Sequence, residues 1–202
     1  MPLRRYSKRF DLSQYYFYDD FVGSNYDNRW WTGRGGGGSL TAQADSILRI
    51  RATANTNYEL YQNDLCDFSV AKNAIHTSRW RVSSLTSMSG EVGFEPTTPD
   101  NATDWLAFIY NSDIGANWQA QSAAGGVTTT IDTGVAADTS YHEFRIETTS
   151  GTLKYFLDGV LVATITTNIS ALLLQPYCWV VSKTAATRDV FFDWIETFGD
   201  RE

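Results

Sequence analysis

The sequence predicts an all-β fold in which two antiparallel sheets pack as a sandwich. Strand-like runs recur at short intervals with turn residues between them, which is typical of sandwiches and barrels. Within many runs apolar and polar residues alternate, so each strand has one buried and one solvated face. The one helix-like stretch, 171–174, gives at most one turn because Pro176 follows it.

Individual strands follow from this alternation and from the turn residues that bound each run. The best-defined segment is 141–166, where Ser150-Gly151 and Asp158-Gly159 separate three runs and predict an antiparallel meander. The run YCWVV is apolar on both faces, which predicts a central strand. The four glycines 35–38 predict a flexible loop. The expected strands are 46–52, 57–62, 78–84, 90–96, 104–110, 117–122, 127–133, 141–148, 153–158, 160–166, 177–183 and 188–198.

Length and composition are those of one folded domain. The 202 residues are 43% hydrophobic and 19% charged, which excludes a largely disordered chain. A chain of this size buries roughly 70% of its unfolded surface, enough for one core. We therefore expect a sandwich domain at 19–202 preceded by a basic-aromatic arm at 1–18. The start lacks an apolar core after its charges, so we expect no secretion signal, no membrane span and synthesis in a cytoplasm.

The charge is divided between the arm and the body. The first ten residues carry +4 and the chain −7, so residues 11–202 carry −11 and disfavour nucleic-acid binding. The arm is either a solvated terminus or a segment that binds an acidic protein surface, RNA or DNA, and docking on a protein is the reading adopted below. The four adjacent aromatics at 15–18 favour burial, so 15–22 is expected to be an edge strand. The docking residues would be Arg4, Arg5, Tyr6, Lys8, Arg9 and Phe10.

The C-terminal half carries a recognisable pattern in which FRIE, YFLDG, LVATITTNI, LQPYCWVV and DVFFDWIE follow one another. Residues 104–198 resemble the concanavalin A-like lectin/glucanase jelly roll, and more narrowly the versions found in bacteriophage virion proteins. The resemblance implies a jelly-roll sandwich. Because this fold carries lectins, hydrolases, lyases and structural modules, the resemblance alone does not define a function.

The sequence contains few residues in an arrangement that would support catalysis. Glucanases of this fold place carboxyl groups along one strand in a pattern like Glu-x-Asp-x-x-Glu. The nearest match has Asp193 and Glu196, but Phe191 replaces the first Glu, and a regular strand would turn the two acids to opposite faces. A lyase set of Tyr141, His142, Arg145 and Gln119 stays open, while His76 has no partner motif. We therefore expect no enzyme, metal or cofactor.

Glycan binding would use an aromatic ring with polar neighbours, because rings stack on sugar faces and amides fix orientation. Trp118 in Ala-Asn-Trp-Gln-Ala is the first candidate for a sugar platform, although a core position is favoured over that role, and a subunit interface is a third alternative. Trp80, Trp179 and Trp194 lie among apolar residues and are expected in the core. Cys66 and Cys178 are expected to be free thiols. The candidate glycan residues are Trp118, Asn117, Gln119 and Trp105.

The resulting hypothesis is a non-enzymatic bacteriophage virion protein that decorates or cements a capsid. Its partners would be the major capsid protein or other virion proteins, and it would lie on the virion surface. Symmetric assembly is common, so we expect a homo-oligomer, with a trimer as the working choice. The alternatives are a receptor- or glycan-binding tail or fibre module that contacts host-surface glycans, and a polysaccharide hydrolase or lyase of the same fold.

Overall fold

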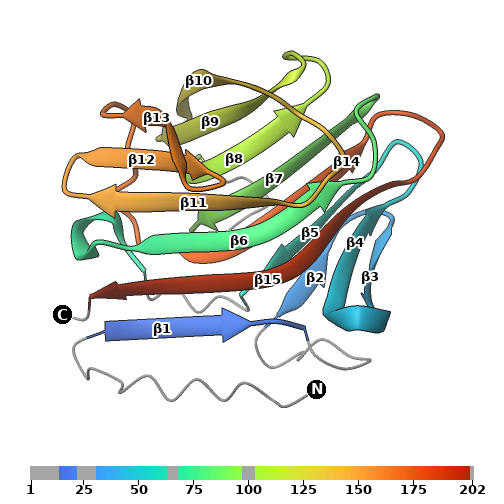
Figure 1. The fold of residues 1–202 in the computed structure, drawn as a ribbon, viewed down its shortest axis with the longest axis horizontal. Helices are drawn as coiled ribbons and strands as arrows, with labels where there is room; N and C mark the ends of the chain where they lie inside the picture. Colours follow the sequence, from blue (N-terminus) through green and yellow to red (C-terminus); the bar gives the residue numbers. More distant parts are fainter. Residues whose placement is uncertain (1–13, 22–30, 63–67, 97–102, 201–202) are drawn as a thin grey trace.

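Two antiparallel sheets form the molecule and pack face to face (Figure 1). The computed structural model describes residues 14–21, 31–62, 68–96 and 103–200. Sheet A has the order β13 (Val160–Ile165), β12 (Thr152–Leu157), β11 (His142–Thr149), β6 (Ile75–Val82), β15 (Arg188–Asp200), β4 (Ile47–Ala52) and β3 (Gly38–Gln43), with β1 (Gln14–Asp19) beside β15. Sheet B has the order β10 (Val127–Ala136), β9 (Asn117–Ala124), β8 (Trp105–Asn111), β7 (Met88–Glu95), β14 (Gln175–Ser182), β5 (Asn57–Tyr61) and β2 (Thr32–Arg34).

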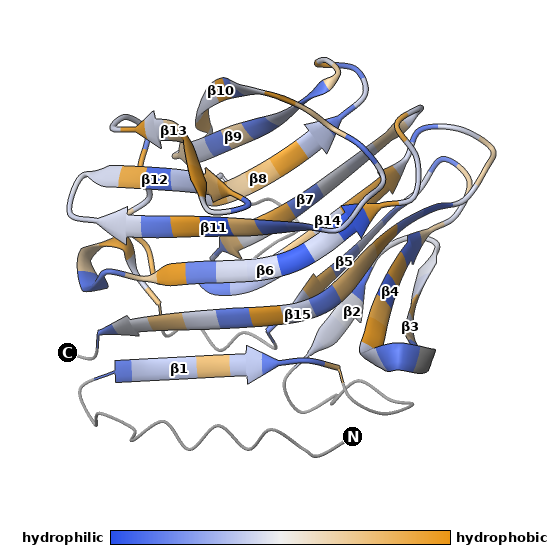
Figure 2. Cartoon of the chain, in the orientation of Figure 1, coloured by the Kyte–Doolittle hydropathy of each residue, from blue (hydrophilic) through white to orange (hydrophobic). Residues whose placement is uncertain are grey.

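The predicted strands are all present, and the all-β sandwich is confirmed. The meander is β11, β12 and β13, and YCWVV lies in β14, between β7 and β5. Figure 2 shows hydrophobic and hydrophilic residues alternating along strands such as β11 and β15. Among the described residues the helical segments are two three-residue turns, Ala44–Ser46 and Val70–Lys72, and neither could cross a membrane.

Strands β2 and β3 were missed because glycines there serve close packing. A Cβ on Gly38 would lie 2.2 Å from the Arg51 carbonyl oxygen, and one on Gly33 would lie 2.5 Å from the Tyr58 hydroxyl. Only glycine lets the chain approach β4 and β5 this closely. The prediction of a flexible loop through Gly38 is therefore wrong, since β3 begins at that residue.

The core lies between the sheets and is dominated by aromatic rings. Trp80 is fully buried, and its ring centroid lies 4.7 Å from Phe144, 5.2 Å from Trp118 and 6.1 Å from Phe192. Such rings bury large apolar areas and add favourable edge or tilted contacts. These four residues come from β6, β11, β9 and β15, so the cluster joins both sheets.

The N-terminal edge strand is confirmed, with bounds Gln14–Asp19. β1 pairs with the second half of β15, while β4 pairs with its first half (Figure 1). Tyr15 and Phe17 pack against the core, whereas Tyr16 and Tyr18 are 39% and 47% exposed. Residues 14–18 thus belong to the sandwich rather than to an arm. The predicted docking residues lie outside the described residues, so the docking arm and the homo-oligomer stay predictions.

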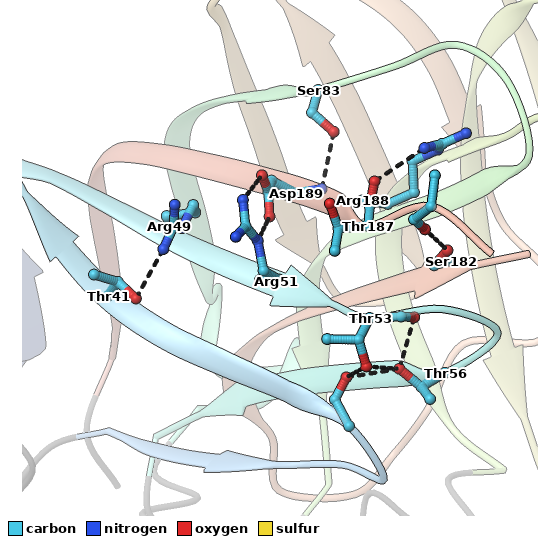
Figure 3. Close-up of polar contacts among 12 residues, drawn as sticks. Thr41, Arg49, Arg51, Thr53, Thr56, Ser83, Ser182, Thr187, Arg188 and Asp189 are labelled. Carbon is cyan, nitrogen blue, oxygen red and sulfur yellow. Dashed lines mark hydrogen bonds and ion pairs between the residues drawn. The ribbon is translucent and has the colours of Figure 1, made fainter. Parts of the chain in front are cut away.

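Polar contacts tie the β3–β4 edge of sheet A to β15 (Figure 3). The Arg51 guanidinium donates to both carboxylate oxygens of Asp189, with Nε–Oδ1 at 2.7 Å and Nη2–Oδ2 at 2.8 Å. Bidentate pairs of this kind are stronger and more directional than single contacts. Nearby, the Thr56 hydroxyl donates to the Gly37 carbonyl oxygen at 2.7 Å. The second bond fixes Gly37, between the end of β2 and the start of β3, to Thr56, which directly precedes β5.

A histidine links the β12–β13 turn to the loop before β11 and should make stability depend on pH. Burial disfavours the charged form of His142, but its hydrogen bonds to Asp158 (2.6 Å) and Asp138 (3.1 Å) prevail and raise its pKa. Stability from this contact is therefore complete below the unfolded pKa and is lost as pH rises through the folded one.

Replacing His142 with glutamine should cost up to about 1 kcal/mol at pH 5.5 or so and less at roughly pH 8, because the aspartates are exposed. Denaturant unfolding at the two pH values measures this difference. An equal loss at both pH values would contradict the ion pair.

Candidate active site

The face of sheet B that points away from the core carries an unusual set of side chains. Because successive strand residues alternate, Cys178 and Val180 of β14 enter the core while Tyr177 and Trp179 point outward. A second, small apolar cluster forms there, separate from the core. We call this side of sheet B the site face. Its cluster comprises Tyr61, Ala107, Ile109 and Tyr177, with Trp105 and Trp179 packed against it.

Two glutamates flank a tryptophan in one row across the site face. Trp179 of β14 lies opposite Glu59 of β5 on one side and Glu91 of β7 on the other. Neighbouring strands lie about 4.8 Å apart, so the Cα atoms of the two glutamates are separated by about 10 Å. The sheet thus presents two carboxyl groups on either side of an indole ring.

The next row places a tyrosine hydroxyl on one of these acids. Tyr177 lies opposite Gly93, two residues beyond Glu91, and its hydroxyl donates to Glu91 Oε2 at 3.2 Å. A Cβ at Gly93 would lie 1.9 Å from the Leu106 carbonyl oxygen. Therefore no side chain fits at this position between Glu91 and Glu95.

Glu91 is poised to change protonation near neutral pH. Burial raises its pKa to about 7 and the charge of Glu59 adds to this, while the Tyr177 hydrogen bond and Lys183 act in the opposite direction. The Glu91 side chain keeps some solvent exposure.

An open cavity of about 470 Å³ lies beside Lys183. In its wall the Lys183 ammonium donates a hydrogen bond to Asp113 Oδ2 at 2.7 Å. The cavity is lined by Leu85, Thr86, Ser87, Ser112, Asp113 and Lys183.

Glu59 and Glu95 form a second, more buried pair of acids. Arg34 Nη2 lies 3.2 Å from Glu59 Oε2, and the guanidinium sits 5.3 Å from the Tyr61 ring centroid. Glu95 is only 2% exposed. Burial raises the pKa of Glu95 far above its ordinary value, and the charge of Glu59 and a hydrogen bond shared with it raise it further. Arg34 opposes this rise in the pKa.

The arrangement supplies one proton donor and one carboxylate side by side. Glu91 holds its proton up to about pH 7. Arg34 favours the charged form of Glu59 because an opposite charge stabilises a carboxylate. Acids whose environments push them toward different protonation states are the usual mark of acid–base or nucleophilic chemistry. Among the described residues, no group of three or more His, Cys, Asp and Glu is placed to hold a metal ion.

The sequence-predicted glycan residues divide between the two faces of β9 and β8. Trp118 is fully buried in the core, which confirms the position favoured for it, so its ring is not available to stack on a sugar and its candidacy as a glycan residue is wrong. Asn117, Gln119 and Trp105 lie on the site face instead. Gln119 is opposite Ile109, in the row of Glu91, and Trp105 Nε1 donates to Gln121 Oε1 at 3.4 Å.

The other sequence candidates are not assembled into a site. A β-bulge between Phe192 and Trp194 places both Asp193 and Glu196 beside Tyr18 on the outer face of sheet A, so the expectation of opposite faces is wrong. Asp193 forms an ion pair with Arg79. The lyase set is divided, because Tyr141, His142 and Arg145 belong to sheet A or its border and Gln119 to sheet B.

The remaining candidates have structural roles or lie outside the description. His76 is buried, and desolvation lowers its pKa to about 3, so it stays neutral. Cys178 is a buried free thiol as predicted, and Trp80 is in the core, while Trp179 lies on the site face instead. Cys66 lies outside the described residues.

Sequence reasoning missed Glu59, Glu91 and Glu95. A usable signal is the segment GEVGFE, in which two acids alternate with core residues inside a predicted strand. It departs from the expected glucanase pattern, because Gly93 stands where that pattern has Asp and the second Glu comes one position early. Glu59 gives no such signal, since only the β5–β14–β7 order brings it near the others.

Comparison with known proteins connects this fold to glucanases. No family model matches the chain. A β-glucanase of Paenibacillus polymyxa is 28% identical over 139 residues, covering 65% of this chain and 52% of its own length. The chain therefore spans about half the length of this curated relative.

Solved structures share the whole sandwich. The Bacillus licheniformis β-glucanase superposes with a TM-score of 0.70 at 15% identity, covering 92% of this chain and 98% of that one. A Mycobacterium tuberculosis protein, Rv0315, described as an immunostimulatory antigen and pseudo β-1,3-glucanase, superposes with a TM-score of 0.70 at 13% identity, with the same coverage. The fold is thus the concanavalin A-like jelly roll of β-glucanases.

These findings correct two predictions. The hypothesis of a non-enzymatic virion structural protein is wrong, because the curated relative is a glucanase and the structural neighbours include glucanases. The expectation that the chain is not an enzyme is contradicted by the same comparisons. The alternative of a polysaccharide hydrolase of this fold fits them better.

Proposed function

We propose that this protein hydrolyses a β-linked glucan and that Glu91 and Glu59 are its catalytic pair. The observation that carries the proposal is the row Glu59–Trp179–Glu91, which places two carboxyl groups around an aromatic ring on the site face. The jelly roll shared with β-glucanases and the sequence similarity to one of them support the substrate class.

The two acids have different tasks. Glycoside hydrolysis needs one carboxylic acid that protonates the leaving oxygen and one carboxylate that acts at the anomeric carbon. Glu91 is the acid, because burial raises its pKa to about 7 and Tyr177 fixes one of its oxygens. Glu59 is the carboxylate, because Arg34 stabilises its charge. Glu95 is 2% exposed against 9% for Glu59, so it has less access to a substrate than Glu59 has.

The remaining side chains of the site face would bind the sugar rings. Trp179 lies between the acids, and Trp105 lies on β8; both remain partly exposed. Aromatic rings stack on the apolar faces of sugars, and amides such as those of Asn117 and Gln119 orient the hydroxyls. Three of the four glycan residues predicted from the sequence thus have a place in this proposal.

The proposal is tested by incubating the full chain with a mixed-linkage β-glucan, a β-1,3-glucan, a xylan and starch. We expect new reducing ends from at least one β-glucan and none from the α-linked starch. If no β-glucan is shortened at any pH between about 4 and 8, the range in which side-chain carboxyl groups and histidine titrate, the proposal is wrong.

A further inference from the structure

We propose that Glu95 is a positioning residue that stays protonated and donates a hydrogen bond to Glu59, which fixes the carboxylate of the catalytic pair. The catalytic meaning of this inference rests on the proposed function. The location of the proton does not, and it can be measured in a protein with or without activity.

The position of Glu95 makes a charged carboxylate there costly. The residue ends β7 on the site face, two positions after Gly93, and is 2% exposed. The adjacent Gln175 donates its amide to the Pro96 carbonyl oxygen at 3.3 Å. Glu95 Oε1 is buried and has no hydrogen-bond partner among the described residues. A carboxylate with an unsatisfied buried oxygen is strongly disfavoured, whereas the neutral acid is tolerated.

The contact with Glu59 requires a proton. Two carboxylates can only accept hydrogen bonds, so the bond that Glu59 and Glu95 share forms only when one of them is protonated. Glu59 has the Arg34 guanidinium 3.2 Å away, which favours its charged form. The proton therefore resides on Glu95, and Glu59 accepts from both Arg34 and Glu95.

The other groups around Glu95 act in the same direction. Glu91 on the same strand and Glu59 on β5 both add negative charge, and Arg34 on β2 is the cation that opposes them. The Tyr177 hydroxyl on β14 is neutral, because burial and the three glutamates raise its pKa well above its ordinary value. In the part of the chain that the structure describes, Arg34 is the guanidinium beside these three acids, and all three cannot be ionised at low cost.

The test compares wild type with Glu95→Gln, whose amide can donate the same bond but carries no proton to lose. A glutamate held protonated in the folded state loses its proton from about pH 4.3 upward only in the unfolded chain, so wild-type stability falls as pH rises. Near pH 4, where the glutamate is protonated in both the folded and the unfolded chain, we expect wild type and Glu95→Gln to have equal unfolding midpoints. The folded-to-unfolded ratio of the variant should then gain up to about tenfold per pH unit relative to wild type.

Glu91→Gln is the matched control. Its gain in stability over wild type should stop increasing near the pKa of Glu91, about 7. The gain of Glu95→Gln should continue to increase above that pH. Carboxyl ¹³C shifts of glutamate-labelled wild type, assigned through the side-chain and backbone connectivity of each residue, give a second measurement that needs no folded variant. On a hydrolysable glucan, Glu95→Gln should retain wild-type kcat and Glu95→Ala should lose most of it. A Glu95 carboxyl that titrates in the ordinary range, or a Glu95→Gln variant less stable than wild type at pH 8 or so, overturns the inference. Absence of hydrolysis with the expected stability curves would overturn only the proposed function.

Discussion

Replacing Glu91 with glutamine should reduce kcat/KM for glucan hydrolysis by about 10²–10⁴-fold, the usual contribution of general acid–base catalysis. Glutamine has the same shape and can still accept the Tyr177 hydrogen bond, but it has no proton to give to the leaving oxygen. The loss should therefore appear in kcat rather than in substrate binding.

The same residue should set the alkaline limit of activity. Burial raises the pKa of Glu91 to about 7, so the acid form is lost as pH rises through that value. A kcat/KM profile of wild type should decline above it. Glu196→Gln on the outer face of sheet A is the matched control and should keep full activity. Wild-type rates in Glu91→Gln would exclude this residue as the acid.

Replacing Trp118 with alanine should destabilise the fold by about 3–5 kcal/mol, as for other large aromatic side chains removed from cores. Trp118 has no exposed surface, and its ring centroid lies 4.8 Å from Phe144 and 5.2 Å from Trp80. The substitution would leave a cavity and remove the contacts through which Trp118 of sheet B packs against Trp80 and Phe144 of sheet A.

Urea unfolding with a fitted m-value measures this loss, and Trp105→Ala on the site face is the control with a smaller expected loss because Trp105 is partly exposed. A loss below about 1 kcal/mol for Trp118→Ala would mean that the ring is not in the core.

The strands could be predicted from the sequence because most follow a period of two between strong turn residues. β2 and β3 could not, because Gly33 and Gly38 are used for close approach to Tyr58 and Arg51, and composition does not distinguish such glycines from those of a loop. For Trp118 the sequence favours a core position over a sugar platform, and the structure confirms the core position. Its neighbours Asn117 and Gln119 point to the other face, so polar flanking residues did not indicate an exposed ring.

The candidate site depends on strand order, which local pattern does not contain. Glu59 and Glu91 become neighbours of Trp179 only because β14, late in the chain, inserts between β5 and β7. The bulge that turns Asp193 and Glu196 to one face of β15 is equally invisible in an alternating pattern. In both cases long-range pairing, rather than propensity, decides which carboxyl groups meet.

Hydrolysis of a defined β-glucan oligosaccharide by wild type and by a Glu59→Gln/Glu91→Gln double variant tests the central claim most directly. Both proteins should show the same far-UV spectrum, and chromatography should resolve the products. We expect shortened oligosaccharides with wild type and unchanged substrate with the double variant. Equal cleavage by both proteins would contradict the assignment of the catalytic pair, and intact substrate with both would contradict hydrolysis itself.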